Sequence, residues 1–166
     1  MTDPNPDKQA DYRVETCAPV DLTAAEIERC TTIVIEGEAI TDPDSVKKWL
    51  PRSVALAVVR KGAEIVAVGA IKPARPPYAR QVAAASEYTF ADDLPELGYV
   101  ARDPVHRNNR FSPRIVAALL KRHGRGPIWA TTSSATIKAA LTDAGFNNQG
   151  KEWGKSSGRL SLWIRE

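Results

Sequence analysis

The fold is decided by one stretch of the sequence, Glu96-Leu-Gly-Tyr-Val-Ala-Arg-Asp-Pro-Val-His-Arg-Asn-Asn-Arg-Phe-Ser-Pro-Arg-Ile-Val-Ala-Ala-Leu-Leu120. The aromatic and β-branched residues in its first part predict a buried strand. In its last part, apolar residues at positions 115, 116, 119 and 120 recur with the spacing of one helix face. Ser112 and Pro113 are typical of an N-cap and a first helical residue. We therefore expect a strand, a short basic loop and an amphipathic helix.

The loop of this unit has the properties of an anion site. A strand that leads into a helix through a short loop presents unpaired backbone N–H groups at the start of the helix. The positive end of the helix dipole lies at the same place. Together these features bind phosphate or pyrophosphate groups, so the sequence predicts such a site at 107–112.

The composition is that of an ordinary globular protein. The chain has 166 residues, of which 43% are hydrophobic and 26% charged, enough for one domain with a full core. Its net charge of +3 is too small to indicate nucleic acid as a partner. No apolar run reaches membrane-spanning length, and the polar N-terminus lacks a signal-peptide pattern. We expect a cytoplasmic protein with no membrane partner.

The two cysteines, Cys17 and Cys30, lack the spacing of a metal site. The first falls on an expected strand and the second on an expected helix face. Buried free thiols are therefore favoured over a disulfide or a nucleophile, and no metal is expected.

Further strands and helices are expected on both sides of the central unit. Residues 1–11 predict a disordered tail, and 12–166 a single domain. Strands are expected at 12–17, 53–60, 64–72, 128–132 and in a closing hairpin from 146 to 164, and helices at 21–37, 42–50, 79–88 and 134–144. Thr23 and Glu26 form a capping-box pattern, and Ser133 or Ser134 is expected to cap the last helix.

This order predicts an α/β fold with a mixed sheet flanked by helices on both faces. A two-residue turn at Lys61-Gly62 makes one pair of strands antiparallel. Two later strand–helix–strand units require parallel pairing.

The same order resembles the GCN5-related N-acetyltransferase (GNAT) family, over roughly residues 12–165. The acyl-CoA motif of that family runs strand, Pro-x-x-(Arg/Gln)-x-x-Gly-x-(Gly/Ala/Ser), helix. The matching positions here are Pro104, Arg107, Arg110 and Ser112. The strand residues Glu96–Val100, followed by His106, Arg107 and Ser112 and then by Ala130-Thr-Thr, look like those of a bacterial subgroup of unassigned substrate.

The resemblance implies an acetyl-CoA-dependent N-acetyltransferase that transfers the acetyl group to an amine by direct attack. The residues implied in binding acetyl-CoA are Val100, Ala101 and Arg102 along the pantetheine arm, Arg107, Asn108, Asn109, Arg110, Phe111 and Ser112 around the pyrophosphate, and Ser134, where the family often has asparagine. Glu96 is implied as the catalytic carboxylate, acting through water. The residues alone are equally compatible with an exposed glutamate at the start of the strand.

Two positions depart from the family pattern. Arg110 replaces the first glycine of the loop, and its side chain either points outward, adds a phosphate contact or blocks the site. Leu141 stands about where the family often has a tyrosine general acid, so that role is unfilled. These departures motivate an alternative function, a CoA-binding or sensing protein with reduced catalytic activity.

The acceptor side of the site is less clear from the sequence. Tyr78 and Tyr88 lie in the variable segment that shapes the acceptor pocket, and either could face it. His106 is expected to be a solvated loop residue. The acceptor is expected to be an amine of a small molecule or a protein. Trp153 and Trp163 on the closing hairpin are compatible with either a core position or a homodimer surface.

Overall fold

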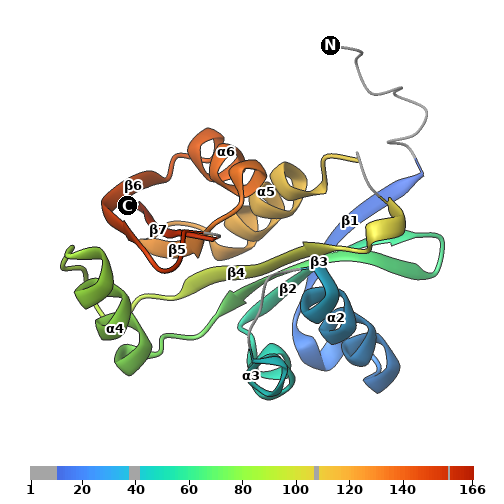
Figure 1. The fold of residues 1–166 in the computed structure, drawn as a ribbon. Helices are drawn as coiled ribbons and strands as arrows, with labels where there is room; N and C mark the ends of the chain where they lie inside the picture. The colour runs from blue at the N-terminus through green and yellow to red at the C-terminus, as the bar shows by residue number, and fades with distance from the viewer. Residues whose placement is uncertain (1–10, 38–41, 107–108, 157) are drawn as a thin grey trace, which may run out of the picture.

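The computed structural model describes residues 11–37, 42–106, 109–156 and 158–166. Its centre is a seven-stranded mixed sheet with helices on both faces, as predicted (Figure 1). The strands are β1 (Tyr12–Cys17), β2 (Ala55–Lys61), β3 (Glu64–Lys72), β4 (Glu96–Arg102), β5 (Ile128–Thr132), β6 (Asn147–Trp153) and β7 (Leu160–Arg165). They lie in the order β1-β2-β3-β4-β5-β7-β6.

Five α-helices and three short 3-10 helices connect the described strands. The α-helices are α2 (Ala24–Gly37), α3 (Pro43–Trp49), α4 (Pro76–Ser86), α5 (Phe111–His123) and α6 (Ala135–Asp143). The 3-10 helices are η1 (Pro19–Asp21), η2 (Leu50–Arg52) and η3 (Pro104–His106). None of the described helices is long and apolar enough to cross a lipid bilayer.

The alternation of side chains along the strands assigns each helix to a face of the sheet. Ala57 and Val59 of β2 pack in one cluster with α5 and α6, whereas Leu56 and Val58 pack in another with α2 and α3. A third cluster places α4 against Trp129 and the β7 side chains. Helices α2 and α3 therefore cover one face next to α4, and α5 and α6 cover the other (Figure 1).

The local signals at two helix starts are confirmed. Thr23 Oγ1 accepts from the N–H of Glu26 at 3.1 Å, and the Glu26 carboxylate accepts from the N–H of Thr23 at 3.0 Å, a complete capping box. Ser134 is the N-cap of α6, with its Oγ accepting from the N–H of Ile137.

Both cysteines are free thiols, and burial raises the pKa of Cys30 to about 12.

The start of the central helix differs from the prediction. Helix α5 begins at Phe111, and its N-cap is Arg110 rather than Ser112. The Phe111 side chain is buried and packs edge-on against the ring of Tyr12. We attribute the earlier start to burial of this aromatic ring in the first turn, a tertiary contact that the spacing of Ser112 and Pro113 does not reveal.

Three other boundaries or pairings also differ. The β2–β3 turn is formed by residues 62 and 63, one position later than predicted. Helix α4 begins at Pro76 instead of 79, because two prolines occupy its first turn, where their missing N–H groups are tolerated. Strand β7 lies between β5 and β6, so only β4 and β5 form a parallel pair among the described strands.

A β-bulge in β4 changes the direction of that strand. Val68 pairs with Ala101 and Ala70 with Gly98, so Tyr99 and Val100 both lie opposite Gly69. Tyr99 accordingly has a positive φ of 55°. The bulge precedes the end of β4 that leads into the acyl-CoA motif, and so it sets the geometry of the site.

Candidate functional site

A cleft opens where β4 and β5 separate. The two strands are paired in register only at Glu96 and Trp129, and β4 diverges from β5 beyond that point. The cleft has a volume of about 470 Å³ and is lined by residues of α3 and α4 as well as of the sheet. Its ionisable lining residues are Asp42, Lys72, Arg75, Tyr78, Glu96 and Tyr99.

A smaller cavity of about 140 Å³ adjoins this cleft at Val100 and Ser134, which line both. It contains six of the residues expected to bind acetyl-CoA: Val100, Ala101, Arg102, Phe111, Ser112 and Ser134. No residue of β5 is paired with 100–102, so the backbone of β4 faces the cavity without a neighbouring strand. This arrangement has the shape needed for an extended ligand beside β4.

The other loop residues predicted to bind acetyl-CoA either do not line the smaller cavity or lie outside the described residues. Arg107 and Asn108 are outside the described residues. Asn109 is half-buried, and its Nδ2 donates to the carbonyl of His106 at 3.0 Å. Asn109 and Arg110 do not belong to the lining of the cavity.

Arg110 has the backbone conformation of a glycine. Its φ and ψ of 48° and 45° lie in the left-handed region, which residues with a Cβ seldom adopt. The side chain is exposed and lines neither the cleft nor the cavity. The Arg110 side chain therefore does not block the site in this structure.

Ser134 combines a structural contact with a free donor. Its Oγ accepts from the N–H of Ile137 at 3.3 Å, and its own N–H donates to Thr132 Oγ1 at 3.0 Å. A hydroxyl that accepts in a cap still has its O–H to donate. Because Ser134 lines both cavities, that O–H is available to a ligand passing between them.

Glu96 is buried, so its interpretation as an exposed strand-end residue is wrong. Only 5% of Glu96 is exposed, and its Oε1 lies 3.1 Å from Nζ of Lys72, a residue directly opposite on β3. Burial opposes the charge of Lys72, but Glu96, Tyr99 and Tyr78 together keep its pKa above the ordinary value. Lys72 is therefore a cation, and the cleft contains a buried ion pair.

Gly98 makes room for this ion pair. A Cβ at Gly98 would lie 2.8 Å from Cε and 3.0 Å from Nζ of Lys72. The Nζ of Lys72 also lies 4.3 Å from the centre of the Tyr99 ring, a cation–π contact. The Lys72 ammonium group thus contacts the Glu96 carboxylate and the Tyr99 ring, in space that the absent side chain of Gly98 leaves free.

Tyr78 is the hydroxyl-bearing residue of α4 that faces the cleft. Burial and the nearby Glu96 carboxylate raise its pKa, although a hydrogen bond with the Thr131 side chain acts in the opposite direction. Tyr78 consequently stays protonated at neutral pH and can donate. Tyr88, the other tyrosine considered for the acceptor pocket, packs against the same cluster around Trp129 as Tyr78 but does not line the cleft.

Leu141 lies in the core with none of its surface exposed, and it lines neither cavity. The polar groups that face the cleft instead include Lys72 and Tyr78. Sequence reasoning missed Lys72, although a cation at the end of the otherwise apolar strand β3 was a usable signal.

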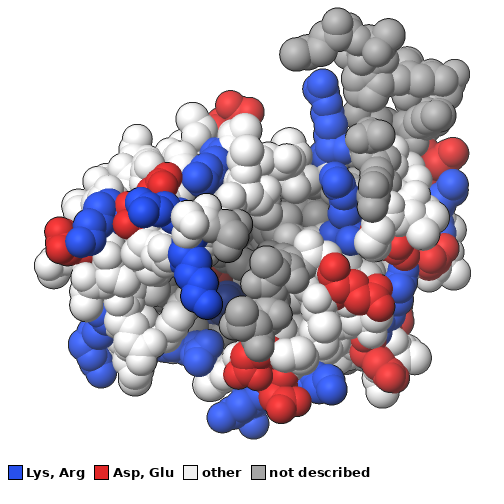
Figure 2. Space-filling model, viewed as in Figure 1, with Lys and Arg blue, Asp and Glu red and all other residues white. Residues whose placement is uncertain are grey.

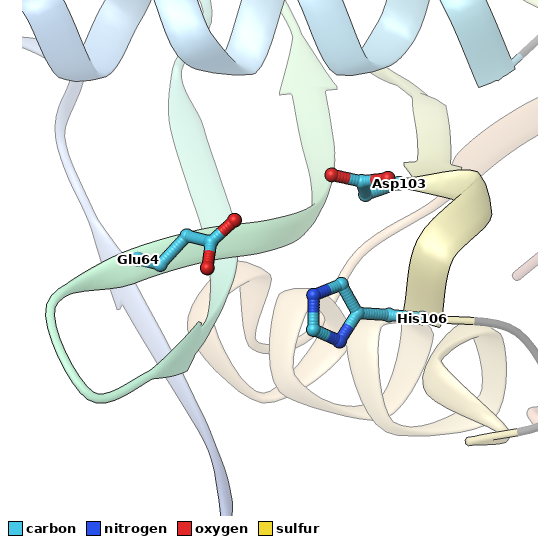
Figure 3. Close-up of side chains that lie close together, drawn as sticks. All are labelled: Glu64, Asp103 and His106. Carbon is cyan, nitrogen blue, oxygen red and sulfur yellow. The ribbon is translucent and has the colours of Figure 1, made fainter.

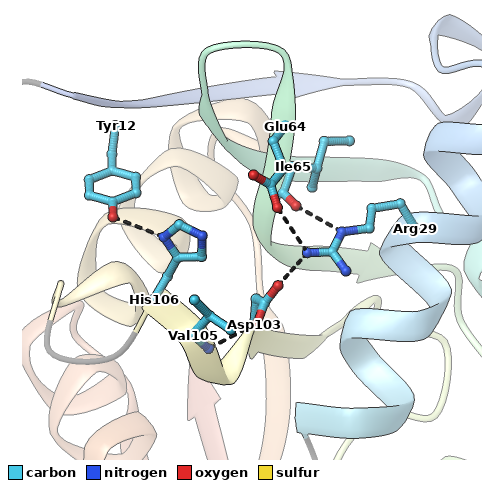
Figure 4. A network of polar contacts seen from close by, with 7 residues as sticks. All are labelled: Tyr12, Arg29, Glu64, Ile65, Asp103, Val105 and His106. Atoms are coloured by element: carbon cyan, nitrogen blue, oxygen red, sulfur yellow. Dashed lines mark hydrogen bonds and ion pairs between the residues drawn. The ribbon is translucent and has the colours of Figure 1, made fainter.

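The expectation that His106 is a solvated loop residue is also wrong. His106 is half-buried, and its Nδ1 lies 2.9 Å from the hydroxyl of Tyr12 (Figure 4). Its ring lies near the carboxylates of Glu64 and Asp103, and potential metal-ligand atoms of the three residues are within 4.8 Å of one another (Figure 3).

This group of residues is an ion-pair network rather than a metal site. Arg29 forms ion pairs with Asp103 and, at 3.6 Å, with Glu64 (Figure 4). The second oxygen of Asp103 accepts from the N–H of Val105 at 2.9 Å. Because both oxygens of Asp103 are engaged and a cation is already present, the network holds η3, at the start of the 104–112 loop, against α2 and β3.

Basic and acidic side chains are interspersed across the face seen in Figure 2. They do not merge there into one basic surface of the kind that binds nucleic acid. The low net charge agrees with this distribution.

Comparison with known proteins identifies the fold. Neither a protein-family model nor a curated protein sequence matches this chain. A GNAT-family acetyltransferase from Streptococcus agalactiae has a TM-score of 0.68 at 10% identity, covering 92% of this chain and 94% of that one. The chain has the fold of the GNAT acetyltransferases.

Two further solved structures have the same fold. An acyl-CoA N-acyltransferase from Pseudomonas aeruginosa has a TM-score of 0.65 at 12% identity, covering 93% of this chain and 99% of that one. A putative acetyltransferase from Salmonella typhimurium, solved with its cofactor acetyl-CoA, has a TM-score of 0.59 at 15% identity, covering 94% of each chain. The GNAT fold predicted from the element order is confirmed.

Proposed function

We propose that this protein is an acetyl-CoA-dependent N-acetyltransferase. The observation that carries the proposal is the separation of β4 and β5, which places a cleft with a buried carboxylate–ammonium pair next to a smaller cavity beside β4. An extended co-substrate fits the cavity, and an acceptor fits the cleft.

The residues around the smaller cavity suit acetyl-CoA. Because β5 does not pair with Val100, Ala101 and Arg102, the side of β4 opposite β3 provides the donors and acceptors of a free strand edge for the pantetheine amides. The N–H groups of Phe111 and Ser112 lie in the first turn of α5, where the helix dipole favours an anion. The resemblance to the family motif also assigns Arg107, Asn108, Asn109 and Arg110 to this proposed pyrophosphate site, and Ser134 contributes a hydroxyl at the junction with the cleft.

When bound, acetyl-CoA supplies a thioester whose carbonyl carbon an amine can attack, forming a C–N bond and breaking the C–S bond. Glu96 accepts the proton lost by the amine, directly or through one water. Lys72 is a positioning residue that fixes the orientation of the Glu96 carboxylate. Tyr78, held in its protonated form, donates a proton to the departing sulfur.

The test combines binding with turnover. Calorimetric titration with acetyl-CoA should give saturable binding, and Ala101→Trp, which fills the smaller cavity, should weaken it at least tenfold. Thiol release in the presence of a panel of primary amines then measures transfer. Absence of binding would overturn the proposal, whereas binding without thiol release from any amine would support the alternative CoA-binding or sensing protein.

A further inference from the structure

The cleft is lined by an arginine that has no ion-pair partner among the described residues. Arg75 lies between β3 and α4 at the N-cap position of the helix, and it lines the cleft. Its guanidinium carbon is 4.3 Å from the centre of the Trp49 ring and 5.3 Å from that of Tyr78. Two aromatic rings on different helices therefore hold the guanidinium in place.

Within the described part of the chain, no carboxylate is paired with Arg75, whereas two other half-buried arginines have such partners; the half-buried Arg114 and Arg165 instead donate to backbone carbonyls. Arg29 is paired with Asp103 and Glu64, and Arg60 with Glu15 and Glu26. On α4 itself, the exposed Arg80 is paired with Asp92. Arg75 is thus a half-buried cation that lines the cleft and has no paired carboxylate among the described residues.

Other cationic side chains lie close to Arg75. Lys48 and Arg52 also lie against the Trp49 ring, with their charged groups 5.1 and 5.5 Å from its centre. The acidic residue of the cleft lining on this side is Asp42, whose Oδ1 accepts from the N–H of Ser45 as the N-cap of α3. Lys72, deeper in the cleft, is already paired with Glu96.

We propose that Arg75 binds a carboxylate of the acceptor, so that the acceptor is an amino acid or a similar small amine that carries a carboxylate. This inference rests on the proposed acetyl transfer. A guanidinium presents parallel N–H donors that match the two oxygens of a carboxylate. A guanidinium that lies over aromatic rings in cation–π contacts can still donate its N–H groups to a carboxylate.

The lining of the cleft supports this assignment. Glu96, Tyr78 and Arg75 all line it, and Glu96 and Arg75 both influence the pKa of Tyr78, so the cleft offers a carboxylate and a guanidinium near one hydroxyl. An amine directed to Glu96 and a carboxylate directed to Arg75 fit this order of charges. A polyamine would place a second cation against Arg75, which costs free energy.

Paired acceptors that differ only in the carboxylate test the inference. Thiol release is measured with L-phenylalanine and phenethylamine, L-tryptophan and tryptamine, and L-lysine and cadaverine. For at least one pair, the kcat/KM of the amino acid should exceed that of its decarboxylated partner at least tenfold. Arg75→Gln should lower the amino-acid value about 10- to 100-fold, as expected for loss of a charged hydrogen bond, and change the decarboxylated value less than about twofold.

Two further variants separate the charge from general damage. Arg75→Lys keeps a cation and should retain part of the preference. Arg80→Gln removes an exposed arginine of the same helix that does not line the cleft, and it should leave all values unchanged. Equal or better turnover of the decarboxylated amines by the wild-type protein would overturn the inference while the proposed acetyl transfer stands.

A binding measurement keeps the inference testable without turnover. Calorimetry with N-acetyl-L-phenylalanine, N-acetyl-L-tryptophan and Nα-acetyl-L-lysine, each compared with its decarboxylated counterpart, reports carboxylate binding directly. Preferential binding of at least one acid that is lost in Arg75→Gln supports the inference even if no amine is acetylated. Equal binding by wild type and Arg75→Gln, or no preference for the acids, overturns it.

Discussion

The Nζ of Lys72 lies 3.1 Å from Oε1 of Glu96 across the β3–β4 pair, and both side chains are buried at the edge of the cleft. A buried ion pair contributes little net stability, but loss of one partner leaves an uncompensated charge. The pair is better explained by its position in the cleft than by a contribution to folding.

The first prediction concerns the stability of this pair. Lys72→Met should lower the free energy of unfolding by about 3–5 kcal/mol, because the Glu96 carboxylate is left buried without a partner. Adding Glu96→Leu should recover most of that loss, since the double variant buries no charge. Urea denaturation measures both.

An exposed lysine provides the control for this experiment. Lys151 is paired with Glu87 at 2.7 Å, with both side chains more than half exposed. Lys151→Met should change the free energy of unfolding by less than about 1 kcal/mol. Equal losses from the two lysine variants would contradict the role given to burial.

The second prediction concerns catalysis by Glu96. Glu96→Gln keeps the shape and a hydrogen-bond acceptor for Lys72 but loses the proton acceptor. We expect transfer to fall about 10²- to 10⁴-fold, with the acetyl-CoA dissociation constant within about twofold of wild type. Single-turnover kinetics and calorimetry give the two values, and unchanged transfer would remove Glu96 from the mechanism.

The third prediction concerns Tyr78 as a proton donor. Burial and the nearby Glu96 carboxylate raise its pKa above the ordinary tyrosine value of about 10, so the protonated form predominates at neutral pH. Tyr78→Phe should therefore lower kcat about 10²-fold at neutral pH without weakening acetyl-CoA binding. In the wild type, activity should show no alkaline decline from this group below about pH 10, and a decline that Tyr78→Phe removes would contradict the assignment.

Much of the fold follows from local sequence signals, and much of the site does not. The strand–loop–helix at 96–120 predicts the β4–α5 unit, and the Thr23–Glu26 pattern forms the expected capping box. Such signals act over a few residues. The insertion of β7 between β5 and β6, by contrast, depends on pairing between distant strands.

The same distinction explains which site residues were found. Residues 100–102 directly precede the acyl-CoA motif, and 111–112 are its last residues. The structure places both segments around one cavity. Lys72 and Arg75 come from a strand end and a loop that no motif marks. Their role depends on cross-strand register and on Trp49, which only the three-dimensional packing brings near.

The final prediction concerns the network beneath the acyl-CoA motif. The N–H of Val105 and the guanidinium of Arg29 lower the pKa of Asp103 below its usual range. A carboxyl group whose pKa is lower in the folded state stabilises the fold above its unfolded-state pKa of about 3.9, and this contribution is lost as the pH falls through the folded-state value. Asp103→Asn should therefore be less stable than wild type at pH 7.

The difference between the two proteins should shrink below about pH 4, since protonation removes the same charge from the wild type. Thermal unfolding between pH 7 and pH 3 measures this convergence. Asp92→Asn, at an exposed pair with Arg80, serves as the control and should differ little from wild type at either pH. A difference between Asp103→Asn and wild type that stays constant over this range would show that the Asp103 charge does not hold η3 in place.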